Sequence, residues 1–387
     1  MAINLLFVGA LDIHEGDFLP FLAAHGYDVT VIDTTSSEFP MFPRDNIGTG
    51  PVYNLYENRK IRFVFKGNLN RAWILKASSG GILEGTGFTF TDVKQILKKK
   101  EIDVIYGSWG SLGLPELRLI RKFNVPIVYE FLTYPIGFSK IVEKVENFFN
   151  RTVINSLAGR VFASSRMLNY MENTFDLQRG SNIVFTESYS KKCFYQKRLP
   201  KLSDDDNKPH LVFIGLDKKY CDIIPQIEQI LQKRIHVHVC ETTGIKERLR
   251  MSRFKDFCHV FKKASSLARA NGSFATFMTQ FDACLVTYDL RRATSARLCI
   301  SVPNRFSFAM TAGIPFVMPR GYLKSCEDII NEHQIGFAYA SYDELKNRLY
   351  DRDLINTYQH NALAKSNIFT LESNFEKIDG FLRKIAA

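Results

Sequence analysis

A cation beside the start of a predicted helix is the clearest chemical signal in this 387-residue sequence. Residues 301–317 hold a loop, a proline suited to a helix start, an amphipathic helix, a glycine at its end and a new apolar strand. The backbone N–H groups of a helix N-terminus attract anions, and Arg305 lies beside them. A cation alone in a first turn is mildly unfavourable against the helix dipole. The segment therefore predicts a diphosphate site, with a solvated arginine as the alternative.

Other polar side chains near this helix could complete an anion site. Asn304 and Ser307 could donate hydrogen bonds to the anion, or could only cap the helix. The loop before the helix holds a cluster that suits a phosphate or an acidic sugar, unless it is simply an exposed basic loop: Arg291, Arg292 and Arg297. Arg320, after the following strand, is a further candidate of the same kind.

The same segment resembles the donor-site helix of the family 4 glycosyltransferases, which runs roughly Pro-Asn-Lys-Leu-Phe-Glu-Tyr-Leu-Ala-Ala-Gly-Lys-Pro-Val. The residues in matching places are Pro303, Asn304, Arg305, Ala312, Gly313 and Pro315. The family's glutamate, which usually grips the ribose hydroxyls of the nucleotide, falls on Phe308. Related transferases also carry a cation after the first strand of the donor domain. Lys218 or Lys219, just past Gly215, matches that cation loosely, and a surface lysine is the alternative.

The resemblance implies transfer of a sugar from a nucleotide diphosphate sugar, with the donor in the C-terminal half and the acceptor in the N-terminal half. Helix dipoles and basic side chains can neutralise the leaving diphosphate, so we expect no metal or other cofactor. An inverting reaction would also need a general base from the N-terminal half, whereas a retaining one could proceed without it. Four candidates fall on or just beyond the carboxyl ends of predicted strands, each with a loop cap or a solvated charge as the alternative: Asp12, His14, Glu15 and Glu130.

Alternating apolar runs and helical stretches must position these residues. Strand-like runs at 3–8 and 28–32 enclose a helical stretch at 17–24, which is the βαβ unit of a parallel doubly wound sheet. A second βα series starts with the apolar run at 210–214. The predicted fold class is therefore α/β, with two Rossmann-like parallel-sheet domains facing a cleft. The resemblance implies the same arrangement, the glycosyltransferase-B architecture.

The chain is long enough for two domains. We expect an N-terminal Rossmann-like acceptor domain at 1–195, a linker at 196–209 and a C-terminal Rossmann-like donor domain at 210–365. The linker is predicted from a polar stretch with three consecutive aspartates and two prolines. A last helix at 366–387 could cross back to the N-terminal domain.

A net charge of +11 and a pI near 9.2 favour an anionic partner such as a nucleotide, a phospholipid surface or nucleic acid. The lysine runs at 98–100 and 262–263 lack interleaved aromatics or a known module, so we expect no nucleic-acid partner. No apolar run of about 18 residues is present, and the first residues lack a cationic leader. Seven widely spaced cysteines without a Cys-x-x-Cys pair argue against a disulfide framework. These features predict a cytoplasmic protein.

The predicted helix at 138–157 is amphipathic, with a polar face that carries Lys140, Lys144 and Arg151. We interpret it as a helix whose apolar side packs on the sheet, with membrane-surface binding as the alternative.

Two histidines, His236 and His238, flank a valine on a predicted strand and so point to one face. Besides these two histidines, Cys240 is the only possible metal ligand at a suitable spacing, and no carboxylate is near in the sequence. We therefore expect no zinc site.

Taken together, the sequence predicts a glycosyltransferase of the hexosyltransferase type that moves a sugar from a nucleotide diphosphate sugar to an acceptor hydroxyl. The basic excess and the amphipathic helix suit a saccharide or lipid-linked acceptor, an envelope polysaccharide among them, and a location at the inner face of the membrane. Because Phe308 replaces the family's glutamate, the alternative is a glycosyltransferase-like partner or scaffold protein without donor binding.

Overall fold

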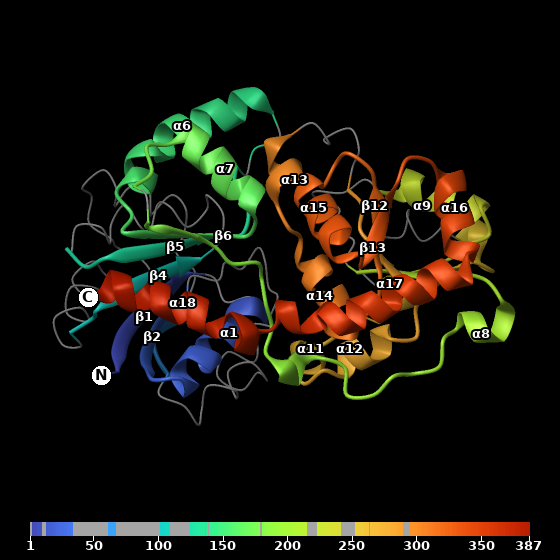
Figure 1. Cartoon of the computed structure of the whole chain (residues 1–387), viewed down its shortest axis with the longest axis horizontal. Helices are drawn as coiled ribbons and strands as arrows, with labels where there is room; N and C mark the ends of the chain where they lie inside the picture. The colour runs from blue at the N-terminus through green and yellow to red at the C-terminus, as the bar shows by residue number, and fades with distance from the viewer. Residues whose placement is uncertain are drawn as a thin grey trace. The chain divides into compact units, whose positions relative to one another are not determined.

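Two compact units make up the computed structural model of the chain. The structure describes residues 2–9, 13–33, 61–66, 101–108, 124–135, 137, 139–178, 180–214, 223–240, 252–262, 264–288 and 295–387. One unit contains Met1–Ser190 together with Asn374–Ala387, and the other contains Lys191–Ser373. The elements of both units are labelled in Figure 1.

The first unit is built on a seven-stranded sheet in which all neighbouring strands are parallel. Across the sheet the strands are β3 (Ile61–Lys66), β2 (Tyr27–Asp33), β1 (Ile3–Gly9), β4 (Val104–Ser108), β5 (Ile127–Phe131), β6 (Gly159–Phe162) and β7 (Asn182–Val184). The helices described here are α1 (Ile13–Ala24), α6 (Lys140–Asn155), α7 (Ser165–Thr174) and most of α18 (Leu371–Ala386). All five residues of β4 and all five of β5 are buried, as the central strands of a parallel sheet require.

The last helix, α18, joins the first unit from Asn374 onward. Tyr27 at the start of β2 donates a hydrogen bond of 2.6 Å from its hydroxyl to Asp379 on this helix. A Cβ atom on Gly159 would lie 2.8 Å from the ring of Phe381, so glycine at the start of β6 lets that ring pack closely. The end of the chain therefore completes the unit that the beginning of the chain forms.

The second unit contains a six-stranded sheet, again parallel at every pair. Its strands in spatial order are β10 (Cys258–Phe261), β9 (His236–Cys240), β8 (His210–Phe213), β11 (Ala283–Leu285), β12 (Phe316–Pro319) and β13 (Gly336–Tyr339). Its α-helices are α8 (Ser203–Asp206), α9 (Ile224–Gln232), α11 (Ser266–Ala270), α12 (Ser273–Met278), α13 (Ala296–Ile300), α14 (Asn304–Ala312), α15 (Lys324–His333), α16 (Tyr342–Tyr350) and α17 (Arg352–Lys365). Short 3-10 turns lie at Lys191–Cys193, Ser252–Phe254 and Ser366–Phe369. The predicted α/β class with two Rossmann-like parallel sheets is confirmed.

The polar segment expected as a linker packs onto the second unit. Gln196 donates its backbone N–H to Thr276 Oγ1 at 2.9 Å, and Leu202 donates its backbone N–H to Gln280 O at 3.0 Å. The backbone N–H of Leu199 donates a hydrogen bond of 2.9 Å to the hydroxyl oxygen of Thr279. The boundary between the units therefore falls at residues 190 and 191, before this segment.

Two residue types set the ends of α14. Pro303 precedes it in an extended conformation, with φ −77° and ψ 145°. Gly313 ends it in the left-handed region at φ +58°, where a Cβ atom would also collide with the side chain of Leu363. Glycine is required there for both reasons.

None of the described helices is long and apolar enough to cross a membrane. The six cysteines in the described part of the chain are free thiols.

Candidate functional site

Arg305 lies at the carboxyl edge of the second unit's sheet. Its guanidinium carbon is 4.8 Å from the ring centroid of Phe213 and 5.0 Å from that of Tyr288, and Nη1 donates to Thr287 O at 3.3 Å. Phe213 ends β8, and Thr287 and Tyr288 follow the neighbouring strand β11. Two rings and a carbonyl group therefore hold a planar cation at the sheet edge where ligands of parallel α/β folds bind.

The start of α14 brings only part of the predicted donor set together. Asn304 and Arg305 occupy the first turn and are both half-buried. Ser307 is 1% exposed and therefore lies in the interior. No side chain caps the helix start, since the N-cap residue is Pro303. Asn304 and Arg305 remain candidates for an anion at this helix start, and the position of Ser307 favours a structural role.

Phe308 is part of the core. Its ring meets that of Phe274 on α12 at 6.1 Å with an interplanar angle of 80°, and the guanidinium carbon of Arg269 on α11 lies 5.2 Å from its centroid. The side chain is 6% exposed. An aromatic residue at the place of the family's glutamate is therefore held by packing and by a cation–π contact.

Several predicted site residues lie outside the described part of the chain. For the donor these are Gly215, Lys218, Lys219, Arg291 and Arg292, and for the acceptor Asp12. Glu15 belongs to α1, but its side chain is also outside the description. The roles of these residues stay predictions.

The two remaining arginine candidates differ from Arg305. Arg320 is paired, because its Nη2 lies 3.0 Å from Glu344 Oε1 and 3.3 Å from Ala338 O. Arg297 lies in α13 and is half-buried. Among the described candidates, Arg305 alone is held between two rings at the strand ends.

His14 and Glu130 meet in the core of the first unit. His14 on α1 places Nε2 3.4 Å from Glu130 Oε1 on β5, and the hydroxyl of Tyr106 on β4 donates to Glu130 Oε2 at 2.7 Å. The His14 ring also stacks on Phe18 at 5.6 Å and meets the edge of Tyr189 at 6.3 Å. Both ionisable side chains are 0% exposed. This burial favours a role in fixing the carboxyl end of β5, and a catalytic role of either residue stays a prediction.

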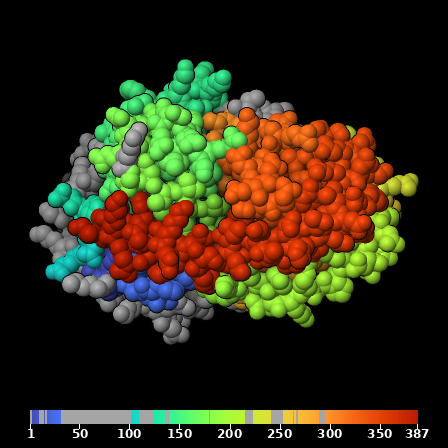
Figure 2. Space-filling view, in the orientation of Figure 1, coloured from blue at the N-terminus to red at the C-terminus, as the bar shows by residue number. Residues whose placement is uncertain are grey.

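Before its last turn, α6 has an apolar outer face and a polar inner face. Asn147 accepts from the Tyr134 hydroxyl at 2.8 Å, Glu143 accepts from Tyr170 at 2.8 Å, and Glu146 accepts from the N–H of Gly137 at 3.1 Å. The large side chains on the other face are half to three-quarters exposed: Ile141, Val142, Val145, Phe148 and Phe149. The interpretation that the apolar side packs inward is therefore wrong for these five residues, whereas Val153 and Ile154 in the last turn are buried. Figure 2 shows atoms of this helix, in green, at the surface of the first unit.

A further polar cluster lies at the amino edge of the second sheet. Among the described residues, Asp206, His210 and His236 are close enough for their ligand atoms to share one metal ion. The expectation that no carboxylate lies near His236 was wrong, because Asp206 approaches from α8, a short helix just before β8. The signal available in the sequence was the spacing of four between Asp206 and His210.

No protein-family model matches the sequence, and no curated protein sequence matches it. Solved structures do match over nearly the whole chain. Sucrose-phosphate synthase from Thermosynechococcus elongatus superposes with a TM-score of 0.70 at 13% identity, covering 99% of each chain. HepE from Anabaena, solved with UDP-glucose, gives 0.67 at 14% identity, covering 99% of this chain and 100% of that one. WaaG, a glycosyltransferase involved in lipopolysaccharide biosynthesis, gives 0.60 at 12% identity, covering 99% and 98%.

The chain therefore has the glycosyltransferase-B fold, with two Rossmann-like domains. The resemblance of residues 303–315 to the family 4 donor helix is consistent with this fold.

Proposed function

We propose that the protein is a nucleotide-sugar-dependent glycosyltransferase whose donor diphosphate binds at the start of α14. The position of Arg305 carries this proposal. It lies in the one segment that resembles a donor helix, and its guanidinium is oriented at the carboxyl edge of β8 and β11. The solved neighbour HepE, which has the same fold, was crystallised with UDP and with UDP-glucose.

The proposed reaction breaks the bond between the anomeric carbon and the diphosphate oxygen and joins that carbon to an acceptor hydroxyl oxygen. Negative charge develops on the leaving diphosphate. The helix N-terminus and Arg305 would stabilise that charge, so this step is proposed to proceed without a metal ion. The hydroxyl proton passes to a base if configuration inverts and to the leaving diphosphate if it is retained. His14 and Glu130 would serve as the base only if the acceptor reaches them in the core.

The test is thermal unfolding of the full chain with uridine, guanosine and adenosine diphosphate sugars at millimolar concentration. One of these should raise the unfolding temperature, because a ligand at about 100 times its dissociation constant stabilises a protein by roughly 2.7 kcal/mol. The same ligand should then support transfer to an acceptor extract. If none of them stabilises the protein, the donor assignment fails.

A second candidate function rests on Phe308. Its ring is packed under Arg269 at the place of a ribose-binding carboxylate, which supports a scaffold or partner protein without donor binding. Such a protein would show no shift with any nucleotide sugar, so the same experiment separates the two functions.

We propose that the acceptor is lipid-linked or belongs to an envelope polysaccharide, and that the protein works at the inner surface of a membrane. The exposed face of α6 supports this. Phe148 is 76% exposed and Ile141 77%, and the exposed cations Lys140 and Lys144 lie beside them. Apolar side chains next to lysines suit the boundary of an anionic bilayer.

Co-sedimentation with vesicles tests the membrane surface. Binding to phosphatidylglycerol-containing vesicles should exceed binding to neutral ones. The double change Ile141→Ser and Phe148→Ser should lower it at least tenfold, because a buried aromatic or aliphatic side chain contributes roughly 1.5–3 kcal/mol. Ile368→Ser removes an exposed apolar side chain from the second unit and should leave binding unchanged. Equal binding of the double variant and the wild type would contradict the assignment.

A further inference from the structure

Four histidines from three neighbouring strands stack on one face of the second unit's sheet. His236 and His238 alternate along β9 and so share a face. The parallel register places His210 of β8 beside His236, and His259 of β10 beside His238. The ring centroids of these pairs are 4.3 Å and 4.5 Å apart. The sheet geometry alone therefore gathers imidazole groups at the amino ends of three strands.

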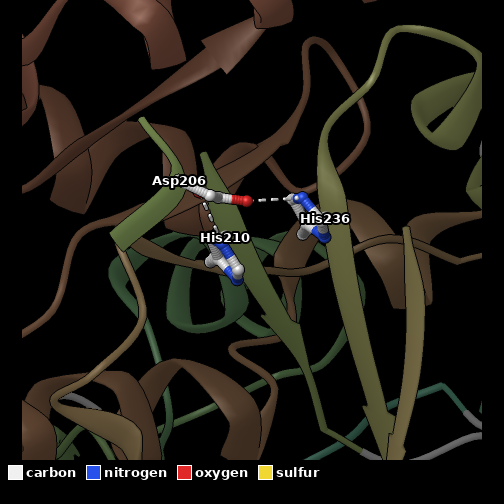
Figure 3. Close-up of side chains that lie close together, drawn as sticks. All are labelled: Asp206, His210 and His236. Atoms are coloured by element: carbon white, nitrogen blue, oxygen red, sulfur yellow. Dashed lines mark hydrogen bonds and ion pairs between the residues drawn. The ribbon is translucent and has the colours of Figure 1, made fainter. Parts of the chain in front are cut away.

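A single carboxylate meets two of these rings. Asp206 Oδ1 lies 3.3 Å from His210 Nε2, and Asp206 Oδ2 lies 2.9 Å from His236 Nε2. Figure 3 shows both rings directed at the carboxylate from adjacent strands. The donor atoms of a tetrahedral zinc ion with bonds of about 2.0–2.1 Å are separated by about 3.3 Å. The ligand atoms of the three groups all lie within 4.8 Å of one another, so one such ion can bind them if the side chains move closer together.

The other two histidines orient the first two. His210 Nδ1 lies 2.9 Å from His238 Nε2, and His236 Nδ1 lies 2.8 Å from His259 Nε2. An N–H on each Nδ1 would donate to the partner ring and leave each Nε2 lone pair directed at the carboxylate. A metal-bound histidine typically has this second hydrogen bond, which fixes its tautomer and its orientation.

We propose that Asp206, His210 and His236 form a zinc site, with water as the fourth ligand and His238 and His259 as positioning residues. The side chains of His210 and His236 are 8% and 7% exposed, and that of Asp206 is 32% exposed. The ion can thus enter from solvent past the carboxylate and bind rings that are already held in place. Two imidazoles and one carboxylate are the ligand types that Zn²⁺ accepts in proteins.

The competing explanation is a cluster without metal, in which neutral Nε2–H groups donate to Asp206. The same distances suit that arrangement, so metal binding itself must be measured.

The site is separate from the donor site. His210 and Phe213 are the two ends of β8, about 10 Å apart at roughly 3.3 Å per residue. The zinc ion would lie at the amino edge of the sheet, and Arg305 packs on Phe213 at the carboxyl edge. The ion would thus tie α8 to β8 and β9 and act on stability. The proposal holds whether or not the protein transfers sugar.

The experiment uses the full, tag-free chain after treatment with a chelator. Zinc chloride is titrated in competition with a chromophoric chelator, and cobalt chloride is added separately to record the visible bands of tetrahedral Co²⁺. Asp206→Asn and His236→Gln keep the shape of each side chain, and Asp205→Asn changes the exposed neighbouring carboxylate on the same helix as a matched control. Circular dichroism checks the fold of each variant.

We expect one zinc ion per chain, a tetrahedral cobalt spectrum and a rise in unfolding temperature with zinc. Asp206→Asn and His236→Gln should each weaken zinc binding at least tenfold, and Asp205→Asn should bind as the wild type does. The shift of unfolding temperature caused by a nucleotide sugar should be the same with and without zinc. Zinc binding that is absent in the wild type, or equally strong in all three variants, would overturn the site.

Discussion

Replacing Arg305 gives the sharpest test of the donor site. Arg305→Ala removes the guanidinium that lies between Phe213 and Tyr288 and leaves the start of α14 in place. A charged hydrogen bond contributes roughly 1.5–3 kcal/mol to binding. At about 1.4 kcal/mol per factor of ten, the loss in donor affinity should be about 12-fold to 140-fold. Arg305→Lys keeps the charge but loses the planar guanidinium. Its affinity for the donor should therefore lie between that of the wild type and that of Arg305→Ala.

The change also affects stability, and the two effects must be separated. Two cation–π contacts at roughly 0.5–1 kcal/mol each and one hydrogen bond of about 1 kcal/mol amount to about 2–3 kcal/mol. Donor affinity is therefore measured by isothermal titration calorimetry at a temperature well below unfolding, with the nucleotide sugar that stabilises the wild type most. Transfer rates are recorded in parallel.

Arg320→Ala is the matched control. Arg320 also follows a strand of the second sheet, but its guanidinium is already bound by Glu344. The Arg320→Ala variant should bind the donor as tightly as the wild type does. If Arg305→Ala keeps donor affinity within a factor of two, or if Arg320→Ala loses as much, the guanidinium at α14 does not hold the diphosphate.

Three further changes test the packing. Burial lowers the pKa of Lys201 to about 8 while an unfolded lysine titrates near 10.4, so its contribution to stability rises by about 1.4 kcal/mol per pH unit above pH 8. The free energy of unfolding of wild type relative to Lys201→Met should thus increase by about 2 kcal/mol between pH 8 and about pH 9.5, and a constant difference would contradict it. Arg160 donates to the carbonyls of Ile154 and Asn155 in the last turn of α6, and Arg160→Met should cost about 2–3 kcal/mol in urea unfolding because these groups stay buried. Phe308→Ala should cost about 3–5 kcal/mol while the donor dissociation constant at low temperature changes less than threefold; a tenfold change would assign Phe308 to the donor site.

The sequence predicted most of the strands because parallel strands in this fold are continuous apolar runs. The predicted runs at 3–8 and 28–32 lie within β1 and β2, and the run at 210–214 contains β8. β10 was not predicted. It is an edge strand of Cys-His-Val-Phe whose side chains are half-buried or exposed, so it lacks the apolar run that marks a central strand.

The sequence could not predict which side of α6 faces the protein interior. Its periodicity separates an apolar side from a polar side, but the partners of the polar side are distant in sequence. Tyr134 and Tyr170 supply hydroxyl groups to Asn147 and Glu143, and these bonds orient the polar side inward. In these turns fold-specific hydrogen bonds outweigh the usual rule that an apolar stripe faces the core, whereas the buried Val153 and Ile154 in the last turn follow that rule.

The sequence did not predict the cluster of histidines around Asp206, for a related reason. The alternation of His236 and His238 was visible, but the carboxylate comes from α8, 30 residues before His236. The register of β8 against β9 brings the two together, and register is a property of the sheet.

The start of α14 keeps the donor-helix pattern, whereas Phe308, one turn later, departs from it. At its start, Pro303 and Arg305 keep the pattern that suits a diphosphate, and Arg305 is fixed by groups that end two strands. One turn later Phe308 departs from the pattern and packs beside Arg269, whose guanidinium is 5.2 Å from the ring. A carboxylate in its place would pair with that arginine before it reached a ribose. We therefore propose that the phosphate-binding end of a donor helix is kept here while the ribose contact is absent, because different neighbours hold Arg305 and Phe308.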